Sequence, residues 1–115
     1  MTDEDCLFCK IVAGEIPGDV VHQTQRTVAF RDINGQAPTH VLVVPRDHYA
    51  NAAELAAGDP ATMAELVTTA AAVATAEGHP DDYRLVLNTG AGAGQSVFHT
   101  HLHLIAGRPL TWPPG

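Results

Sequence analysis

Three histidines alternate with other residues near the end of the chain, in the run FHTHLHLI at residues 98–105. On a β-strand, alternate side chains share one face, so His99, His101 and His103 would stand in a row about 6–7 Å apart. Imidazole takes up a proton near neutral pH and serves as nucleophile, acid, base or metal ligand. The pattern predicts a reactive or ligand-binding face; the alternative is one buried histidine with two that face water. The opposite face would anchor the strand in the core through Phe98, Thr100, Leu102 and Leu104.

The chain has two cysteines, and both lie in one C-x-x-C at Cys6 and Cys9. In a reducing compartment this spacing favours metal binding or redox chemistry over a structural disulfide. No strand is predicted before the motif, which argues against a thioredoxin-like site. Two cysteines supply half of a tetrahedral zinc site, so histidines elsewhere would have to complete it. Inert thiols are the alternative interpretation.

A glycine-rich loop, NTGAGAGQS at residues 88–96, precedes the histidine run. Its glycines allow backbone N–H groups to converge and cradle an anion, although a flexible hairpin loop has the same composition. A strand rather than a helix follows, and the loop has no lysine, so it is neither a Rossmann fingerprint nor a P-loop. Asp32, at the end of a predicted strand, is suited either to bind sugar hydroxyls or to form a turn.

Length and charge narrow the classes of function. The 115 residues predict one domain, and the net charge of −7 with six lysines and arginines argues against a nucleic-acid groove. The acidic start has no apolar run after it, which predicts no signal peptide. The longest apolar stretch, residues 61–76, is interrupted by Glu65 and is too short to span a bilayer. We therefore expect a cytoplasmic protein without a nucleic-acid or membrane partner.

Periodicity predicts an α+β fold with an antiparallel sheet, because strands and helices do not alternate as βαβ units. Asp59 followed by Pro60 is the start signal of a long helix that ends near Glu77. Its predicted buried face is Met63, Leu66, Val67, Ala70 and Val73. The other predicted elements are a short helix at residues 6–13 and strands at residues 20–23, 28–31, 40–44, 83–88 and 98–105.

The residues of the histidine run resemble the signature of the histidine triad (HIT) family. The resemblance extends to the Hint branch through residues 6–11, 14–17, 37–40, 44–45 and 112–115. It implies a HIT-like fold over residues 1–115, with a five-stranded antiparallel sheet, one long helix and one short helix. It also implies a homodimer with a continuous ten-stranded sheet, and a purine nucleoside phosphoramidase-like activity that cleaves nucleotidyl conjugates at the α-phosphorus.

The family's functional residues match positions of this chain one by one. His101 corresponds to the nucleophile that forms a nucleotidyl-histidine, which water then hydrolyses. His103 corresponds to a phosphate contact, His40 to a supporting histidine and Ser96 to a residue near the leaving group. Asp32 corresponds to the ribose-binding carboxylate. The remaining nucleotide-binding positions are Phe8, Phe30, Ile33 and Leu42 around the base, Asn88 and Gln95 near the phosphate, and the backbone N–H groups of Gly94 and Val97.

The C-x-x-C resembles that of bacterial members which hold zinc. The corresponding ligands are Cys6, Cys9, His48 and His99, and the resemblance implies a structural rather than a catalytic zinc. Arg31 stands where some Hint members carry histidine, and Thr100 replaces the usual aliphatic residue.

Three alternatives to a phosphoramidase are carried forward. One is a dinucleoside polyphosphate hydrolase, and another is a nucleotide-binding scaffold dimer with weak catalysis. The third is a metallo-hydrolase in which His99, His101 and His103 share one ion. By resemblance, the stiff tail at residues 111–115 would lie near the other subunit's site and influence leaving-group preference.

Overall fold

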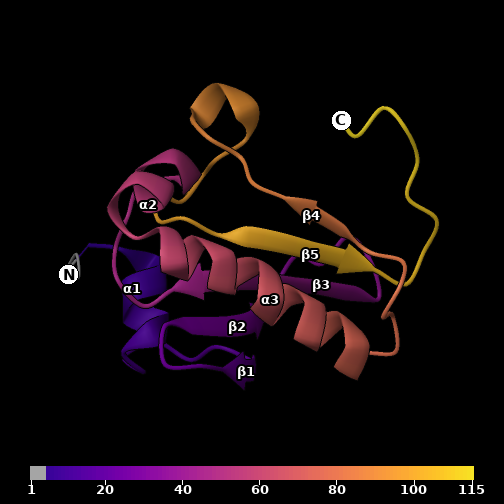
Figure 1. Cartoon of the computed structure of the whole chain (residues 1–115), viewed down its shortest axis with the longest axis horizontal. Helices are drawn as coiled ribbons and strands as arrows, with labels where there is room; N and C mark the ends of the chain where they lie inside the picture. The colour runs from indigo at the N-terminus through magenta and orange to yellow at the C-terminus, as the bar shows by residue number, and fades with distance from the viewer. Residues whose placement is uncertain (1–4) are drawn as a thin grey trace.

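The computed structural model describes residues 5–115 (Figure 1). Most of the acidic start that predicted the absence of a signal peptide lies outside these residues. Among the residues described, no helix combines the length and apolar character needed to cross a bilayer. The elements are α1 (Leu7–Val12), β1 (Val20–Gln23), β2 (Thr27–Arg31), β3 (Thr39–Pro45), α2 (Ala52–Gly58), α3 (Pro60–Ala76), β4 (Arg84–Val86), the 3-10 turn η1 (Ala91–Ala93) and β5 (Leu102–Ala106).

The five strands form one antiparallel sheet in the order β1-β2-β3-β5-β4. β3 and β5 are neighbours, with Leu42 opposite His103 and Val41 opposite Leu104. β1 and β4 are the edges. The predicted α+β class and five-stranded antiparallel sheet are confirmed.

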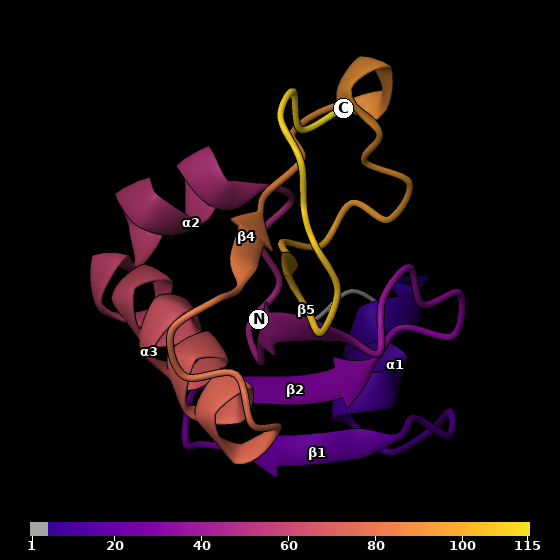
Figure 2. The same ribbon diagram turned by 90° about the vertical axis from the view of Figure 1, so that its right-hand side faces the viewer.

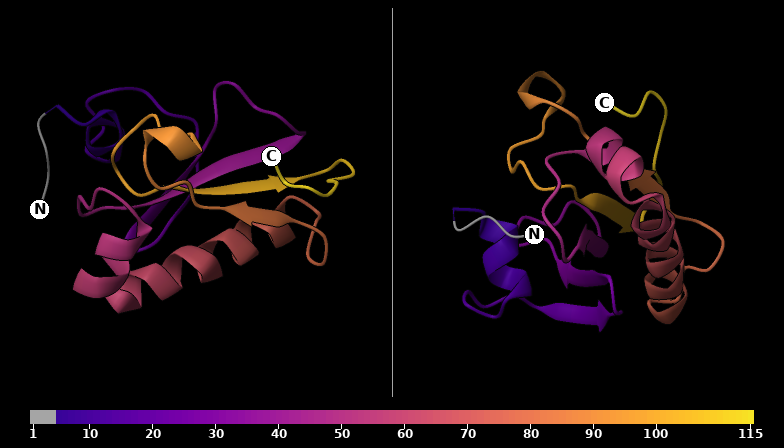
Figure 3. Two further views of the ribbon diagram at one scale, coloured as in Figure 1. Left: turned by 90° about the horizontal axis from the view of Figure 1, so that it is seen from above. Right: turned by 60° about the vertical axis from the view of Figure 1, so that its left-hand side comes forward.

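Helices cover the sheet on both faces, with α3 on one face and α1 on the other (Figures 2 and 3). All seven residues of β3 are buried, because alternate side chains enter different cores. Val41 and Val43 pack in the core beneath α3, together with Leu66 and Leu104. The residues between them enter the core beneath α1: Leu42 and Val44 pack with Phe8, Cys9, Val28 and Phe30.

The long helix begins where it was predicted to begin. The Asp59 carboxylate accepts hydrogen bonds from the Thr62 N–H at 3.2 Å and the Thr62 hydroxyl at 2.6 Å, and Pro60 occupies the first turn. Leu66 is buried, but Val67 is 43% exposed, so its predicted place on the buried face is wrong. Successive helical residues differ by about 100°, and the helix packs on the Leu66 side.

The short helix α2 was not predicted. The Asn51 side chain accepts a hydrogen bond from the Glu54 N–H at 3.0 Å and so caps its first turn. Asn followed three residues later by Glu is a helix-start signal that the sequence carried. Only Leu55 is buried in this helix, which explains why hydrophobic periodicity missed it.

The histidine run is not one long strand. β5 begins at Leu102, and Phe98 is 53% exposed, so its predicted role as a core anchor is wrong. The cause lies in the preceding residues: the Tyr49 carbonyl accepts hydrogen bonds from the Thr100 N–H at 2.8 Å and the Thr100 hydroxyl at 3.0 Å. These bonds hold the run away from the sheet until Leu102. β4 is likewise shorter than predicted, at Arg84–Val86.

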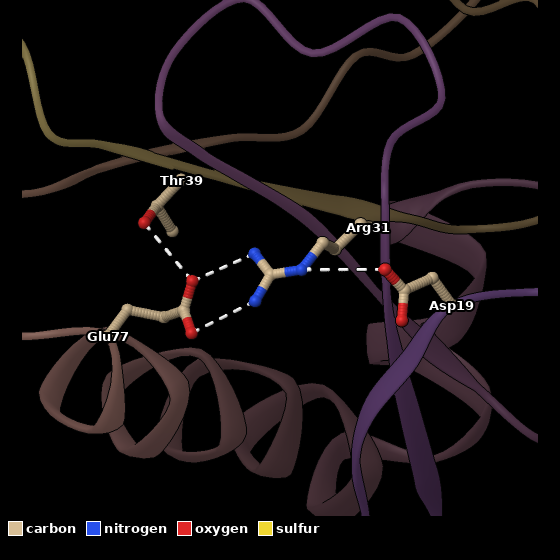
Figure 4. A network of polar contacts seen from close by, with 4 residues as sticks. All are labelled: Asp19, Arg31, Thr39 and Glu77. Carbon is tan, nitrogen blue, oxygen red and sulfur yellow. Dashed lines mark hydrogen bonds and ion pairs between the residues drawn. The ribbon is translucent and has the colours of Figure 1, made fainter.

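A polar network joins the end of β2 to the end of α3 (Figure 4). The Arg31 guanidinium donates two hydrogen bonds to the Glu77 carboxylate, at 2.8 and 3.1 Å, and its Nε lies 3.6 Å from Asp19. The Thr39 hydroxyl donates to the same carboxylate at 3.3 Å. The hydrogen bonds from Arg31 lower the pKa of Glu77. The guanidinium of Arg31 is therefore held by the carboxylates of Glu77 and Asp19.

Candidate active site and metal centre

A pocket of about 280 Å³ lies on the α1 side of the sheet. Its walls combine apolar side chains with one carboxylate and two imidazoles, the mixture expected for a small-molecule site. Eight of the predicted nucleotide-binding residues line it: Phe8, Asp32, Ile33, Leu42, Ser96, Val97, His101 and His103. Ile33 is 96% exposed, so it forms the rim of the pocket.

His101 is buried and has a fixed ring orientation. Its Nδ1 lies 2.8 Å from the backbone carbonyl of His99, which can only accept a hydrogen bond. Nδ1 therefore carries a proton, and in the neutral ring Nε2 keeps its lone pair. The ring of Phe8 meets the His101 ring edge-on, with centroids 5.0 Å apart and planes at 81°. The free lone pair gives His101 the protonation state that a nucleophile needs.

His40 and His103 form a hydrogen-bonded pair. The Gln36 N–H donates to His40 Nδ1 at 3.0 Å, so the proton of the neutral ring is on Nε2. His40 Nε2 lies 2.9 Å from His103 Nδ1 and 3.4 Å from an Asp32 oxygen. It therefore donates to His103, whose own proton is left on Nε2.

Burial, together with smaller effects of the neighbouring His101 and His40, lowers the pKa of His103 to about 4 against the opposing effect of Asp32. His103 is thus neutral at pH 7. Asp32, His40 and His103 lie close enough together to bind a metal. However, His40 would have to give up the Gln36 hydrogen bond to ligate through Nε2. We therefore interpret this group as a hydrogen-bond chain.

A second cluster lies at the start of α1. His99 is fully buried, and its Nε2 donates to the Pro45 carbonyl at 2.9 Å, which leaves the lone pair on Nδ1. That Nδ1 lies 3.3 Å from Cys6 Sγ, 3.4 Å from Cys9 Sγ and 3.2 Å from His48 Nδ1. His48 Nδ1 is also 3.5 Å from Cys9 Sγ. Four potential ligand atoms converge on one point.

The donor set and its spacing fit tetrahedral zinc. Zn–N bonds of about 2.0–2.1 Å and Zn–S bonds of about 2.3 Å place ligand nitrogens about 3.3 Å apart and nitrogen–sulfur pairs about 3.6 Å apart. The observed separations are 3.2 Å between nitrogens and 3.3–3.5 Å between nitrogen and sulfur. Burial lowers the pKa of His99 to about 4, so this ring is neutral, as a ligand must be.

The two clusters contradict the alternative in which three alternating rings share one metal. His99 faces the cysteines, His103 faces His40, and His101 belongs to neither group of potential ligands. The run leaves the sheet before Leu102, so its first two rings are not held in the same row as the third.

Four predicted nucleotide-binding residues do not line the pocket. Phe30 is buried behind Phe8, with ring centroids 5.4 Å apart, and supports the wall. Gln95 is buried and holds the glycine-rich loop: its amide oxygen accepts from the Gly90 N–H, and its nitrogen donates to two carbonyls. Asn88 lies beside Gly94, where φ is +95°. Nucleotide contacts by Phe30, Asn88, Gly94 and Gln95 stay predictions.

Other residues of the site were missed. Ile11 lines the pocket and lies three positions after Phe8, so helical spacing could have found it. Leu7 and Asn34 also line the pocket and were missed. Arg31 lines it too, at the position where some Hint members carry histidine. The Gln36 N–H that fixes the His40 tautomer is a backbone group, for which the sequence carries no signal.

The antiparallel sheet, with the histidine run leading into its inner strand β5, is the arrangement of the histidine triad proteins. The sequence profile of the HIT domain matches residues 13–110, and the chain belongs to this family. A HIT family hydrolase from Legionella pneumophila Philadelphia 1 has a similar structure, with a TM-score of 0.92 and 48% identity over 96% of this chain and 100% of that one. These relationships place the chain among HIT family hydrolases.

Two further relatives are similar over nearly their whole length. A purine nucleoside phosphoramidase of Escherichia coli strain K12 is 43% identical over 108 residues, which cover 93% of this chain and 91% of that protein. A 14 kDa zinc-binding protein of Zea mays is 42% identical over 117 residues, covering 100% of this chain and 91% of that protein.

Proposed function

We propose that this protein hydrolyses purine nucleoside phosphoramidates, or related nucleotidyl conjugates, at the α-phosphorus through a nucleotidyl-His101 intermediate. The observation that carries the proposal is the His101 ring, whose Nδ1 is held by the His99 carbonyl while Nε2 keeps its lone pair beside the pocket. The similarity to the Escherichia coli phosphoramidase supports the substrate class.

The proposed first step is attack by His101 Nε2 on the α-phosphorus. A new nitrogen–phosphorus bond forms and the bond to the amine breaks. The departing amine takes up a proton that comes from solvent water, for which the Ser96 hydroxyl is the proposed relay. The His101 ring becomes cationic, and the His99 carbonyl at 2.8 Å stabilises the proton on Nδ1. Water then attacks phosphorus, the bond to Nε2 breaks and a proton of the attacking water is released to solvent. The nucleoside monophosphate and a neutral His101 remain.

The proposed role of His40 and His103 is to donate a hydrogen bond to the phosphoryl group. His40 donates to His103 Nδ1, which leaves His103 Nε2–H available as the donor. Because His103 is neutral at pH 7, this donor does not place a second full charge beside the His101 cation. Asp32, which lines the same pocket, is the proposed acceptor for the ribose hydroxyls.

We further propose that Cys6, Cys9, His48 and His99 bind a structural zinc ion. The donor set, its spacing and the similarity to the maize zinc-binding protein support this assignment. When bound, the ion supplies folding free energy by joining α1 to the two segments that carry His48 and His99.

A homodimer remains part of the proposal, with residues 1–115 acting as one HIT domain in the cytoplasm. β4 is an edge of the sheet, so its outer hydrogen-bonding groups are available to a second copy, and pairing there would give ten strands. Arg84 on this edge donates to the Thr111 carbonyl at 2.9 Å and holds the tail beside it.

Two measurements test the proposed dimer and its tail. Sedimentation equilibrium should give twice the chain mass. Deleting residues 111–115 should change the order of preference among leaving groups and leave AMP affinity nearly unchanged.

The test of the proposed activity is turnover of adenosine 5′-phosphoramidate, with diadenosine polyphosphates measured in parallel. We expect AMP release from the phosphoramidate and a covalent AMP adduct on His101 in acid-quenched, mass-analysed protein. Faster turnover of the polyphosphates would favour the dinucleoside polyphosphate hydrolase. AMP binding without turnover of either compound would favour the scaffold dimer.

A further inference from the structure

The two histidine clusters are joined through His99. Its ring offers Nδ1 to the cysteine cluster, while its backbone carbonyl accepts the Nδ1–H of His101. The ring is anchored on its other side by the Pro45 carbonyl at the end of β3. A displacement of His99 in the first cluster therefore moves the group that orients His101 in the second.

Phe8 is a second connection between the clusters. It lies between the two cysteines in the chain, on a helix of six residues whose N-cap is Cys6. Its ring packs against His101 at 5.0 Å and against His99 at 6.1 Å, and it lines the pocket. A six-residue helix has little stability of its own, so α1 depends on its anchoring contacts.

The same short segment separates the two clusters and lines a cavity beside each of them. A second cavity of about 320 Å³ is lined by Cys6 and His48, and Ser96 and Val97 line both this cavity and the pocket of the candidate active site. The residues that follow are held to the segment after His48 by the hydrogen bonds between Thr100 and the Tyr49 carbonyl. The same short segment thus borders the cysteine cluster and the reacting group.

We propose that the cluster of Cys6, Cys9, His48 and His99 positions the nucleophile: holding its four ligand atoms together fixes the His101 ring through the His99 carbonyl and the Phe8 ring. This inference rests on the proposed role of His101. It assigns to the cluster an effect on the reaction rate in addition to its contribution to folding.

The chemistry of the cluster makes its geometry dependent on a bound cation. The ring nitrogens of His48 and His99 lie 3.2 Å apart, and the His99 lone pair points at both thiols. A tetrahedral ion would bond to all four ligand atoms at once, whereas without it the thiol hydrogens compete for the single His99 lone pair. Removing a metal ion from the folded protein should therefore loosen the cluster. A displacement of about 1 Å at a reacting group costs about 100-fold in rate.

The first experiment compares the zinc-loaded full-length protein with the same protein after chelation, and then after Zn²⁺ is added back. The ¹⁵N NMR resonances of the His101 ring report its tautomer without turnover. We expect a single Nδ1–H tautomer with zinc and averaging between two tautomers after chelation. In protein that circular dichroism shows to be folded, kcat for adenosine 5′-phosphoramidate should fall about 10- to 100-fold and recover with Zn²⁺.

An unchanged His101 tautomer and unchanged kcat in folded, zinc-free protein would overturn the inference. Failure of the zinc-loaded protein to turn over the phosphoramidate would contradict the proposed function instead. In that case, the tautomer measurement alone still decides whether the cluster orients the ring.

The second experiment weakens the Phe8 connection and keeps all four ligands. Phe8→Leu removes the ring edge that contacts His101, and Phe98→Leu makes the same change at an exposed position. Both variants should retain bound zinc. We expect Phe8→Leu to lower kcat several-fold and to shift the His101 ring resonances, whereas Phe98→Leu should leave kcat and these resonances unchanged. Equal kinetics and spectra for the two variants would contradict a positioning role for Phe8.

Discussion

Histidine occurs twice in the cluster at the start of α1 and twice in the hydrogen-bond chain of the pocket. The two groups differ in the hydrogen bonds that these histidines make. Around His99, Nε2–H is engaged by a backbone carbonyl, and the lone pair meets two thiols and a second imidazole. In the pocket, a donor faces an acceptor at each contact, from the Gln36 N–H through His40 to His103.

This difference decides the chemistry of each histidine. Where two thiols and two imidazole nitrogens converge, a metal cation can bind all four atoms at once. Where donors and acceptors alternate, the protons are already placed, and one nitrogen can be left free to react. His99 and His101 are two residues apart, and they differ in the nitrogen that bonds to a carbonyl: Nε2 in His99 and Nδ1 in His101. This difference underlies the different functions that we propose for them.

The strongest test of the comparison is to remove the free nitrogen. His101→Ala should lower turnover of adenosine 5′-phosphoramidate by about 10³-fold or more, because the covalent route is lost. Initial-rate kinetics measure the loss, and AMP affinity measured by calorimetry should survive. His22→Ala, at an exposed histidine on β1, is the matched control and should behave as wild type. If His101→Ala retained more than a few per cent of the activity, the assignment of the nucleophile would be wrong.

The converging cluster should respond in stability. The double variant Cys6→Ser, Cys9→Ser should lose bound zinc and lower Tm by more than about 5 °C, the shift expected from about 1 kcal/mol in a chain of this size. Metal analysis and calorimetry check both effects. A chelator should lower the Tm of the wild type in the same way and leave the variant unchanged. A metal-free wild type that melts as the variant does would favour inert thiols.

A pH series tests the alternating cluster. Burial gives His103 a pKa of about 4 in the folded protein, against an ordinary value of 6.5. Between these values the unfolded chain binds more protons, so stability is fully present above pH 6.5 and is lost as the pH falls towards 4. Denaturant unfolding should show this slope, and His103→Asn should reduce it. Parallel curves for the two proteins would contradict a neutral, buried His103.

The smallest effect is expected at Arg31, which lines the pocket but bonds to Glu77. Glu77→Gln should cost less than about 1 kcal/mol, because the pair is partly exposed and screened by solvent. Since the pKa of Glu77 is lowered, this contribution is lost as the pH falls below the carboxyl's ordinary value. Unfolding curves at low and high salt measure it, with Glu54→Gln as the exposed control. A large loss of AMP affinity in Glu77→Gln would show that Arg31 also serves the pocket.

Much of the fold followed from local signals. The Asp59-Pro60 start of α3, the β-branched strand at residues 40–44 and the strand at Val20–Gln23 were predicted, because capping residues and apolar periodicity act over a few residues. The extent of the histidine strand was predicted wrongly. Its first residues bond to Tyr49, which is about fifty positions earlier in the chain, and no local pattern records that contact.

The sequence by itself determined the inventory of chemistry: the alternating imidazoles, the paired thiols and a family signature that matched functional residues position by position. The resemblance also implied how the histidines are divided, but only the tertiary structure gave the hydrogen bonds that distinguish them. Backbone groups of Pro45, His99 and Gln36 place the protons on His99, His101 and His40, and the fold brings Pro45 to His99 from 54 positions earlier in the chain. The proton on His103 is placed by the His40 side chain, which lies 63 positions earlier. A hydrogen-bond partner depends on position in space, and residue spacing along the chain does not specify it.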